Sequence, residues 1–309
     1  MRVVLKRILQ LIFVLIGICV VTFLLVHMVP GDPARVIAGD RASPETIEAI
    51  RQRFGLDLPL WQQFVTYAGN LLSGDIGLSM RYKRPVVDLI AQFIWPTLFL
   101  TGYVICLAVP PAVALAIASA RKPGGVADQL IRFFGIAGMA IPVFWLGIMM
   151  SRFFGVSLGW FPVSGYGKTF VDHLHHLFLP ALSTAIWMVP VLVQSLRAAL
   201  IEKSAADFVT AARAQGAGER EIFWRTILPN AILPTLNLFG VIVAFLIGGT
   251  IIVETVYAVP GLGSLMVNSL LARDYHVVQG LTLMFAVTTV MVTFIVDLIS
   301  VAIDPRARL

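Results

Sequence analysis

The sequence contains few charged residues. They make up 13% of its 309 residues, whereas hydrophobic residues make up 58% and the mean hydropathy is +0.88. An ordinary soluble domain has about 25% charged residues. The composition therefore predicts an integral membrane protein and excludes an ordinary soluble enzyme. The formal net charge of +6 does not indicate a nucleic-acid partner, because the Lys and Arg residues lie at the ends of apolar runs rather than on one face.

The sequence also has only two cysteines and no complete nucleotide-binding motif. Cys19 and Cys106 lie within apolar runs, which excludes a disulfide framework and a CxxC site and predicts packing roles. Gly167-Lys168-Thr169 resembles the end of a phosphate-binding loop, but Pro162 occupies the position of the motif's first glycine. We therefore expect no cofactor and no nucleotide hydrolysis by this chain, so that energy must come from a partner.

Three neighbouring histidines, His173, His175 and His176, are the one candidate metal cluster. No carboxylate or cysteine at a ligand spacing completes a site around them. The favoured interpretation is a polar patch at the membrane interface, with metal ligation as the alternative, so we expect no metal.

Six apolar runs are long enough to cross a bilayer core of about 30 Å. The first lacks a small-residue cleavage site before Pro30, which favours a retained span over a signal peptide. The sequence thus predicts an all-α, polytopic membrane protein with six transmembrane helices in a single domain over residues 1–309. The runs cover roughly residues 8–29, 97–120, 133–156, 177–200, 235–256 and 281–303.

The basic residues of the short connecting segments are distributed unevenly. Most fall on one side of the predicted bundle, and the positive-inside rule assigns that side to the cytoplasm. Both termini and residues 204–234 are therefore predicted to be cytoplasmic, and residues 30–96 extracytoplasmic. The basic residues on the cytoplasmic side are Arg2, Lys6, Arg7, Arg121, Lys122, Arg132, Arg197, Lys203, Arg213, Arg220, Arg225, Arg306 and Arg308, against Arg152, Lys168 and Arg273 on the other.

The predicted extracytoplasmic segment, residues 30–96, has its own helical signals. Ser43 is a suitable N-cap for a helix over residues 44–54, with proline at its first position and Gly55 at its end. Residues 59–72 carry an apolar side, which predicts an amphipathic helix that packs on the bundle or lies at the interface. Its apolar residues are Leu60, Phe64, Ala68, Leu71 and Leu72.

Residues 204–234 interrupt the apolar chain with a polar, helical stretch. Ala205, Phe208, Val209 and Ala212 recur at helical spacing and predict one short amphipathic helix. Gly216 and Gly218 break it. A second short helix is expected from about Glu219, with Glu219 and Glu221 in its first turn and Pro229 at the end of its regular run.

These residues resemble the cytoplasmic EAA loop of ABC importer permeases. Ala211, Ala212, Gly216, Leu228 and Pro229 match it, whereas Thr210 and Thr226 replace its usual glutamate and isoleucine. The variant TAARAQG is similar to the dipeptide, oligopeptide and nickel branch of that family. Blocks along the whole chain resemble the same branch, including PGDPA at 30–34, GWFPVSGYG at 159–167, ETVYAVPGLG at 254–263, RDYHVVQG at 273–280 and DLISVAIDPRAR at 297–308.

The resemblance implies an inner-membrane permease subunit of a bacterial peptide importer, surrounded by lipid. The implied partners are a second homologous permease, two ATP-binding subunits and an extracytoplasmic solute-binding protein. By the same resemblance, residues 204–234 would couple the permease to the ATPase; a surface helix pair that only stabilises the bundle is the alternative. The implied docking residues are Asp207, Ala211, Ala212, Gly216, Ala217, Gly218, Glu219, Leu228 and Pro229.

Glu254 is a further candidate site residue, because an ionisable group at membrane depth is costly and usually faces a cavity or a partner. It would contact a binding protein or the pathway, or anchor its helix at the headgroups. The cargo stays open between a peptide, nickel and another small solute. An ion-coupled secondary transporter is a less favoured alternative, because residues 1–150 and residues 151–309 show no internal repeat of each other. No group of residues in the sequence suggests the catalytic site of an enzyme.

Overall fold

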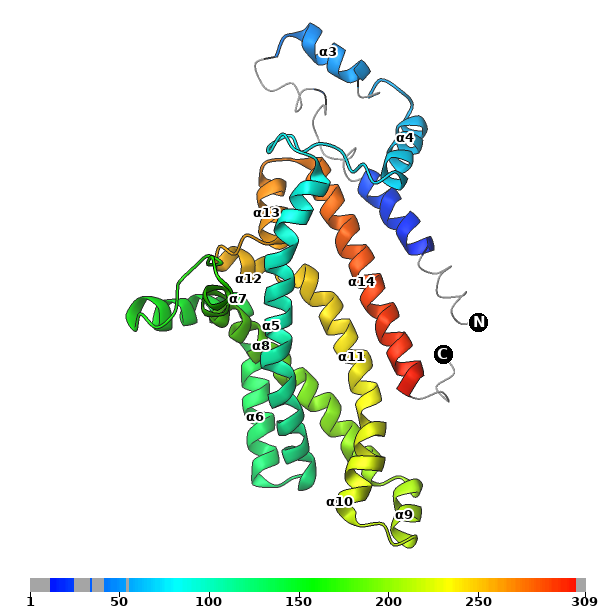
Figure 1. The fold of residues 1–309 in the computed structure, drawn as a ribbon, viewed down its shortest axis with the longest axis vertical. Coiled ribbons are helices and arrows are strands. Elements are labelled where there is room, and N and C mark those ends of the chain that lie inside the picture. Colours follow the sequence, from blue (N-terminus) through cyan, green and yellow to red (C-terminus); the bar gives the residue numbers. More distant parts are fainter. Residues whose placement is uncertain (1–11, 25–33, 35–41, 54–55, 304–309) are drawn as a thin grey trace. The chain divides into compact units, whose positions relative to one another are not determined.

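The computed structural model describes residues 12–24, 34, 42–53 and 56–303. In these residues the fold is all-α, and Leu78 and Pro85 form an isolated antiparallel bridge. The basic residues near both termini and most of the PGDPA block lie outside the described residues. The helices, several of them labelled in Figure 1, are Ile12–Leu24, α3 (Pro44–Arg53), α4 (Leu60–Leu72), α5 (Val86–Arg121), α6 (Val126–Ala140), α7 (Val143–Met150), η1 (Ser151–Ser157), α8 (Phe170–Ser204), α9 (Asp207–Ala214), α10 (Glu219–Ile222), η2 (Phe223–Ile227), α11 (Leu228–Gly249), α12 (Ile251–Val256), α13 (Leu262–Leu271) and α14 (Tyr275–Ile303).

The chain divides into two compact units. Residues 1–93 and 265–287 form the first, and residues 94–264 and 288–309 form the second. Helices α5, α13 and α14 pass from one unit to the other. The single domain expected from the sequence stays a prediction.

Four helical runs in the described residues are apolar and long enough to span a membrane: residues 86–121, 170–204, 219–256 and 275–300. The first three each contain one predicted span, and the fourth covers residues 281–300 of the predicted span 281–303. The runs extend beyond the apolar stretches because polar residues such as Asp88 and Lys203 continue the helices at their ends. The predicted first span contains the helix Ile12–Leu24, and the rest of that run lies outside the described residues.

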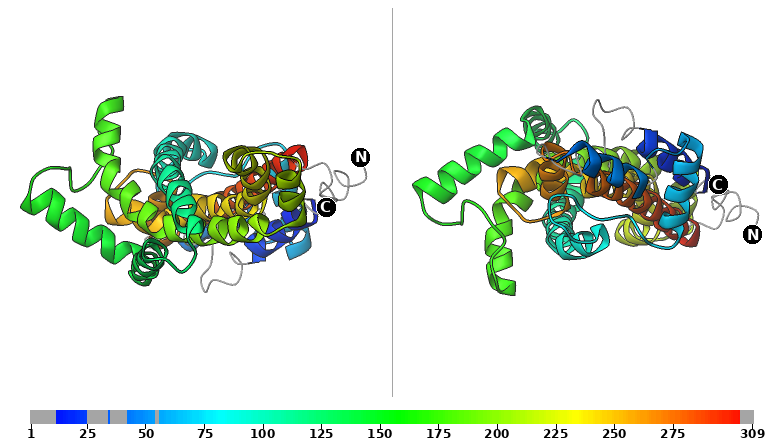
Figure 2. Two further views of the ribbon diagram at one scale, coloured as in Figure 1. Left: turned by 90° about the horizontal axis from the view of Figure 1, so that it is seen from below. Right: turned by 90° about the horizontal axis from the view of Figure 1, so that it is seen from above.

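The predicted third span is not one straight helix. Residues 126–140 and 143–157 meet at an angle of 92°, so the prediction of an uninterrupted helix over 133–156 is wrong. The break occurs at Ile141, which is extended with φ −86° and ψ 122°. Pro142 follows it and disfavours the helical conformation at the preceding residue. In Figure 2, α6 is viewed nearly end-on while α7 and η1 run across the picture. If the bent pair is counted as one span, the described residues hold five.

Helix α8 is the centre of the second unit and packs against α6, α7 and α11. Small residues permit these contacts, as expected for helices packed in a membrane. A Cβ on Gly135 would lie 3.3 Å from Pro190, and one on Gly138 would lie 3.6 Å from the Ile186 carbonyl. The hydroxyl of Tyr257 donates a hydrogen bond of 2.9 Å to the Gly147 carbonyl.

Other glycines differ in their surroundings. A Cβ on Gly248 would have no neighbour within 4 Å, whereas Gly240 faces Val296 so closely that a Cβ would lie 2.6 Å from it. The GxxxG pair Gly155 and Gly159 does not join two helices. Gly155 packs against Val163 of the following loop, and Gly159 has φ +66° just after η1.

The first unit confirms both predicted helices of residues 30–96. The Ser43 hydroxyl accepts a hydrogen bond of 3.3 Å from the Thr46 amide at the start of α3. Helix α4 packs against Ile12–Leu24 through Phe23, whose ring centroid is 5.4 Å from that of Phe64 and 5.8 Å from that of Tyr67. The predicted apolar side is only partly correct: Phe64, Ala68 and Leu71 are half-buried, but Leu60 and Leu72 are exposed.

Candidate functional site

The 204–234 segment forms two short helices at the ends of α8 and α11 (Figure 1). Helix α9 ends in a turn in which the amide of Gly216 donates to the Arg213 carbonyl at 3.0 Å and that of Ala217 donates to the Ala212 carbonyl at 3.2 Å. Gly216 has φ +84°, a conformation that favours glycine. Gly218 has an ordinary φ of −73° and is the N-cap of α10. The predicted helix, turn and second helix starting at Glu219 are confirmed.

An ion pair crosses this turn. The Arg213 guanidinium donates to both carboxylate oxygens of Glu219, at 2.7 and 3.2 Å, and so joins α9 to α10. The two side chains are 49% and 70% exposed, and the Glu219 carboxylate raises the pKa of Arg213. A surface pair of this kind fixes geometry and adds little stability, about 0–1 kcal/mol.

The inner side of the segment is apolar. Val209 and Ile222 are fully buried, Leu228 is buried, and Ala212 and Ala217 are half-buried against the same core. Three of the nine expected docking residues, Ala212, Ala217 and Leu228, therefore contribute mainly to the packing of the segment itself. A large or charged residue at these positions would disturb the segment before it reached a partner.

The outer side carries the other six expected docking residues. They are exposed in the structure: Asp207, Ala211, Gly216, Gly218, Glu219 and Pro229. The sequence alone did not distinguish these exposed residues from the three packing residues. Two aromatic residues add apolar surface, Phe208 with 40% and Trp224 with 54% of its surface exposed. The sequence places Phe208 in the apolar stripe of the first short helix, and Trp224 was not among the expected site residues. Exposed aromatic side chains are the residues that most often anchor protein interfaces.

The predicted end of the second helix at Pro229 is wrong. Residues 219–256 form one helical run, in which the π-helix η2 connects α10 to α11 and Pro229 lies in the first turn of α11. Proline has no amide hydrogen to donate, and Pro229 comes directly after η2, where the helical hydrogen-bonding pattern changes from i→i+5 to i→i+4. The segment is thus directly continuous with a membrane helix on one side and separated from α8 by Ala205 and Ala206 on the other.

Glu254 lies in a second polar cluster, the Glu254 cluster, formed by Thr97, Thr250, Glu254, Leu262 and Ser264. Its carboxylate accepts hydrogen bonds from the Thr97 hydroxyl at 2.6 Å, the Thr250 hydroxyl at 3.2 Å and the Ser264 amide at 3.0 Å, while the Thr97 hydroxyl accepts from the Leu262 amide at 2.8 Å. Glu254 has no exposed surface. In this conformation its carboxylate and the Thr97 hydroxyl hold the first turn of α13 onto α5 and α12, and the carboxylate is not open to a soluble partner.

Two of the three histidines, His173 and His175, contact the loop between η1 and α8, and His176 contacts its own helix. One ring nitrogen of each lies within hydrogen-bonding distance of a backbone carbonyl, those of Tyr166 for His173 (2.7 Å), Trp160 for His175 (2.8 Å) and Asp172 for His176 (2.9 Å). Among the described residues no group of three His, Cys, Asp or Glu side chains is arranged to hold a metal ion. Thr169 of the Gly-Lys-Thr sequence is the N-cap of α8, in a capping box with Asp172.

Comparison with known proteins gives matches over nearly the whole chain. Residues 1–101 match the N-terminal model of binding-protein-dependent transport system membrane components, and residues 112–309 match the model of binding-protein-dependent transport system inner membrane components. The glutathione transport system permease protein GsiC of Escherichia coli (strain K12) is 39% identical over 305 residues, which cover 99% of this chain and 98% of that protein. The protein of that name from Shigella dysenteriae serotype 1 matches equally well.

Solved structures show the same fold at lower identity. An inward-facing structure of the MetNI methionine ABC transporter matches with a TM-score of 0.55 and 19% identity, covering 70% of this chain and 97% of the other. The crystal structure of an amino acid ABC transporter with histidines matches with a TM-score of 0.54 and 14% identity, covering 69% and 94%.

Proposed function

Because the chain belongs to the family of binding-protein-dependent transport system inner membrane components, we propose that it is one of two permease subunits of an ATP-driven peptide importer. A second six-span permease supplies the other wall of the pathway. Two separate ATPase subunits supply the energy in the cytoplasm, and a solute-binding protein delivers the cargo from outside. In this arrangement both termini and the 204–234 segment are cytoplasmic, and residues 30–96 are extracytoplasmic.

The observation that carries the proposal is the exposed outer side of α9 and α10. It combines small residues with two exposed aromatic side chains on a segment held internally by Val209 and Ile222. Such a surface suits insertion into a groove of a partner, since small residues permit close approach and aromatic residues anchor it. ATP binding brings the two ATPases together, and each moves the segment docked to it. Its attachment to α8 and α11 passes the movement to the bundle, which alternates between outward-open and inward-open states.

Peptides are the cargo that the similarity favours. The curated relatives are named for the transport of glutathione, itself a small peptide. Nickel or another small solute is the alternative. Uptake of glutathione, a dipeptide and nickel, each with the cognate binding protein in proteoliposomes, distinguishes these cargoes. Uptake driven by an ion gradient without ATP would instead support a secondary transporter.

Substitution of Gly216 tests the docking surface. Gly216→Leu places a large side chain on an exposed turn, at a position where a Cβ would meet no atom of this chain within 4 Å, so we expect its bulk to act mainly against a partner. We expect ATP-dependent uptake in proteoliposomes to be abolished while the protein is still inserted.

Two matched controls separate docking from folding. Gly216→Ala adds the same backbone strain, about 1 kcal/mol, without the bulk, and Gly218→Ala adds a methyl group at an ordinary φ. Both should retain most of the uptake. If Gly216→Leu folds, co-purifies with the ATPases and still permits stimulation of hydrolysis by the loaded binding protein, the 204–234 segment is not the coupling element.

A further inference from the structure

A buried ion pair lies where α5, α6 and α8 meet, in the second unit. We call it the Asp128 cluster, formed by Ser119, Gly124, Asp128 and Arg197. The Arg197 guanidinium donates to both carboxylate oxygens of Asp128, at 2.6 and 2.7 Å, and to the Ser119 hydroxyl at 3.0 Å. The Ser119 hydroxyl and the Gly124 amide, the latter at 2.8 Å, also donate to the carboxylate. The Asp128 side chain has no exposed surface and that of Arg197 is 19% exposed.

The cluster joins three helices through one carboxylate. Ser119 lies near the end of α5, Gly124 in the turn that follows, Asp128 in the first turn of α6, and Arg197 on α8. Arg197 precedes the end of α8 at Ser204 by seven residues, about 10 Å along a helix at about 1.5 Å per residue. The 204–234 segment begins there, so Arg197 lies on the same rigid element that leads into it.

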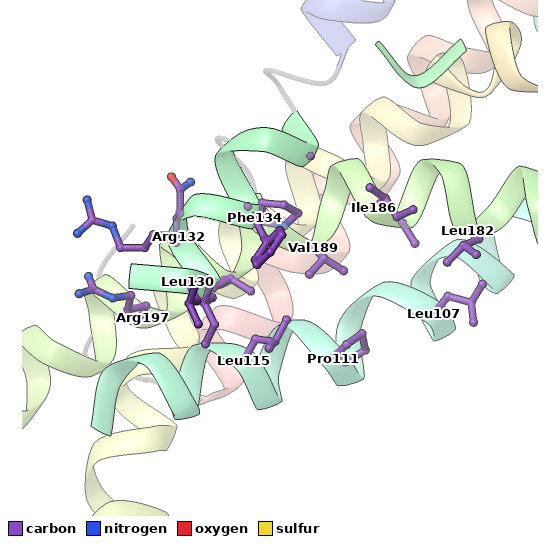
Figure 3. Close-up of a pocket in the computed structure, with 17 residues that line it drawn as sticks. Leu107, Pro111, Leu115, Leu130, Arg132, Phe134, Leu182, Ile186, Val189 and Arg197 are labelled. Carbon is purple, nitrogen blue, oxygen red and sulfur yellow. The ribbon is translucent and has the colours of Figure 1, made fainter. Parts of the chain in front are cut away.

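Above the cluster, α5 is separated from α6 and α8 by an apolar groove of about 410 Å³ (Figure 3). Leu107, Pro111 and Leu115 line it from α5, and Arg132 and Arg197 lie at one end. Helix α6, in contrast, contacts α8 directly at Gly135 and Gly138. Below the groove, the buried Ala112 and Ala116 of α5 pack in the core shared with α8, and the polar contacts of Ser119 and Gly124 add a fixed connection of α5 and its turn to the other two helices at this end.

We propose that Asp128 and Arg197 are positioning residues for energy coupling, which make α6 and the end of α5 move with α8 when the 204–234 segment moves. This rests on the proposed function. A buried, bidentate pair suits the task, because its geometry is fixed and its separation would leave an uncompensated buried charge. The segment joins α11 through η2 and joins α8 through Ala205 and Ala206, and the Asp128 cluster extends the second connection from α8 to α6 and the end of α5.

The test uses the complete complex with its partner permease, ATPases and binding protein in nanodiscs. Spin labels at Ala127→Cys and Glu202→Cys, two exposed positions on α6 and α8, report the distance between these helices after Cys19 and Cys106 are replaced. Without the substitution at Asp128 we expect a narrow distance distribution that ATP and vanadate trapping does not change. Asp128→Asn should broaden it and make it depend on nucleotide.

Transport supplies the second readout. Asp128→Asn should lower uptake per ATP hydrolysed at least about tenfold, the factor that a coupling loss of about 1.4 kcal/mol produces, while ATPase binding and basal hydrolysis persist. Arg132→Gln, which removes an arginine at the same end of the groove but outside the cluster, is the matched control and should leave both readouts unchanged. If Asp128→Asn fails to insert, Arg197→Lys tests the proposal instead, because lysine keeps the positive charge but not the bidentate contact with both carboxylate oxygens of Asp128.

An unchanged distance distribution together with unchanged uptake in these variants would overturn the proposal. So would a broadened distribution with normal coupling, because the connection would then be structural only. Absence of ATP-dependent uptake in the wild-type complex is a different result, which would overturn the proposed function itself.

Discussion

The 204–234 segment and the Glu254 cluster are both polar interruptions of an apolar chain, but they treat charge in opposite ways. In the segment, Arg213 and Glu219 pair across a turn in full contact with solvent. In the cluster, Glu254 has no exposed surface and is surrounded by hydroxyl and amide donors. The first arrangement leaves a surface available to a partner, and the second fixes the positions of backbone segments within the chain.

The difference separates docking from positioning. An exposed ion pair can be replaced by contacts with water at little cost in free energy, so such a pair is compatible with an interface that moves. A buried carboxylate requires all its hydrogen bonds, so the segments that supply them must stay in place. On this basis we propose positioning roles for Asp128 and Glu254 and a docking role for the outer side of α9 and α10.

Glu254→Ala should have the largest effect on stability. It would leave the hydroxyls of Thr97 and Thr250 and the amide of Ser264 without their buried acceptor and open a cavity, which we expect to cost roughly 3–5 kcal/mol. Thermal unfolding of the purified subunit in detergent measures this loss. Glu254→Gln keeps the size and one acceptor oxygen and should lose less. Equal, small losses for both variants would mean that the cluster does not hold the turn.

Gly240→Ala should have an intermediate effect. Its Cβ would lie within 3 Å of three Val296 side-chain atoms, and overpacking of this kind costs about 1–3 kcal/mol. Gly248→Ala on the same helix meets no atom within 4 Å and should be neutral or slightly stabilising, because alanine favours helix by about 1 kcal/mol over glycine. Combining Gly240→Ala with Val296→Ala should recover part of the loss, measured by the same unfolding experiment. No recovery would contradict a steric cause.

Local signals predicted the elements of this fold well. Ser43 and Pro44 marked the start of α3, and the acidic first turn marked the start of α10 at Glu219. These features depend on neighbours in sequence, so the sequence contains them completely. The sequence also correctly placed the helical turn at Gly216, whose φ of +84° favours glycine.

Features that depend on distant residues were harder to predict. Gly240 and Gly248 have similar apolar surroundings in sequence, and only the position of Val296 on α14 distinguishes them. Asp128 was not identified from the sequence, and Arg197 was counted only as a basic residue on the cytoplasmic side, because their pairing joins residues 69 positions apart. Prediction of the exposed side of the 204–234 segment had the same limitation. Helical spacing placed Phe208 and Val209 on one apolar side, but in the structure only Val209 is buried.

Arg213→Gln should have the smallest effect and completes the comparison. Both partners of its ion pair are largely exposed, so the free energy of unfolding should change by less than about 1 kcal/mol, with the difference decreasing further as salt screens the pair. The pair nevertheless sets the angle between α9 and α10, so binding to the ATPases should weaken more than stability does.

Arg225→Gln removes an exposed i,i+4 pair with Glu221 within one helical run and is the matched control, since it does not cross the turn. Unfolding and co-purification with the ATPases, measured at low and high salt, separate the two quantities. A loss of stability as large as that of Glu254→Ala would show that exposure does not distinguish the two regions, because a solvated pair would then contribute as much as a buried carboxylate.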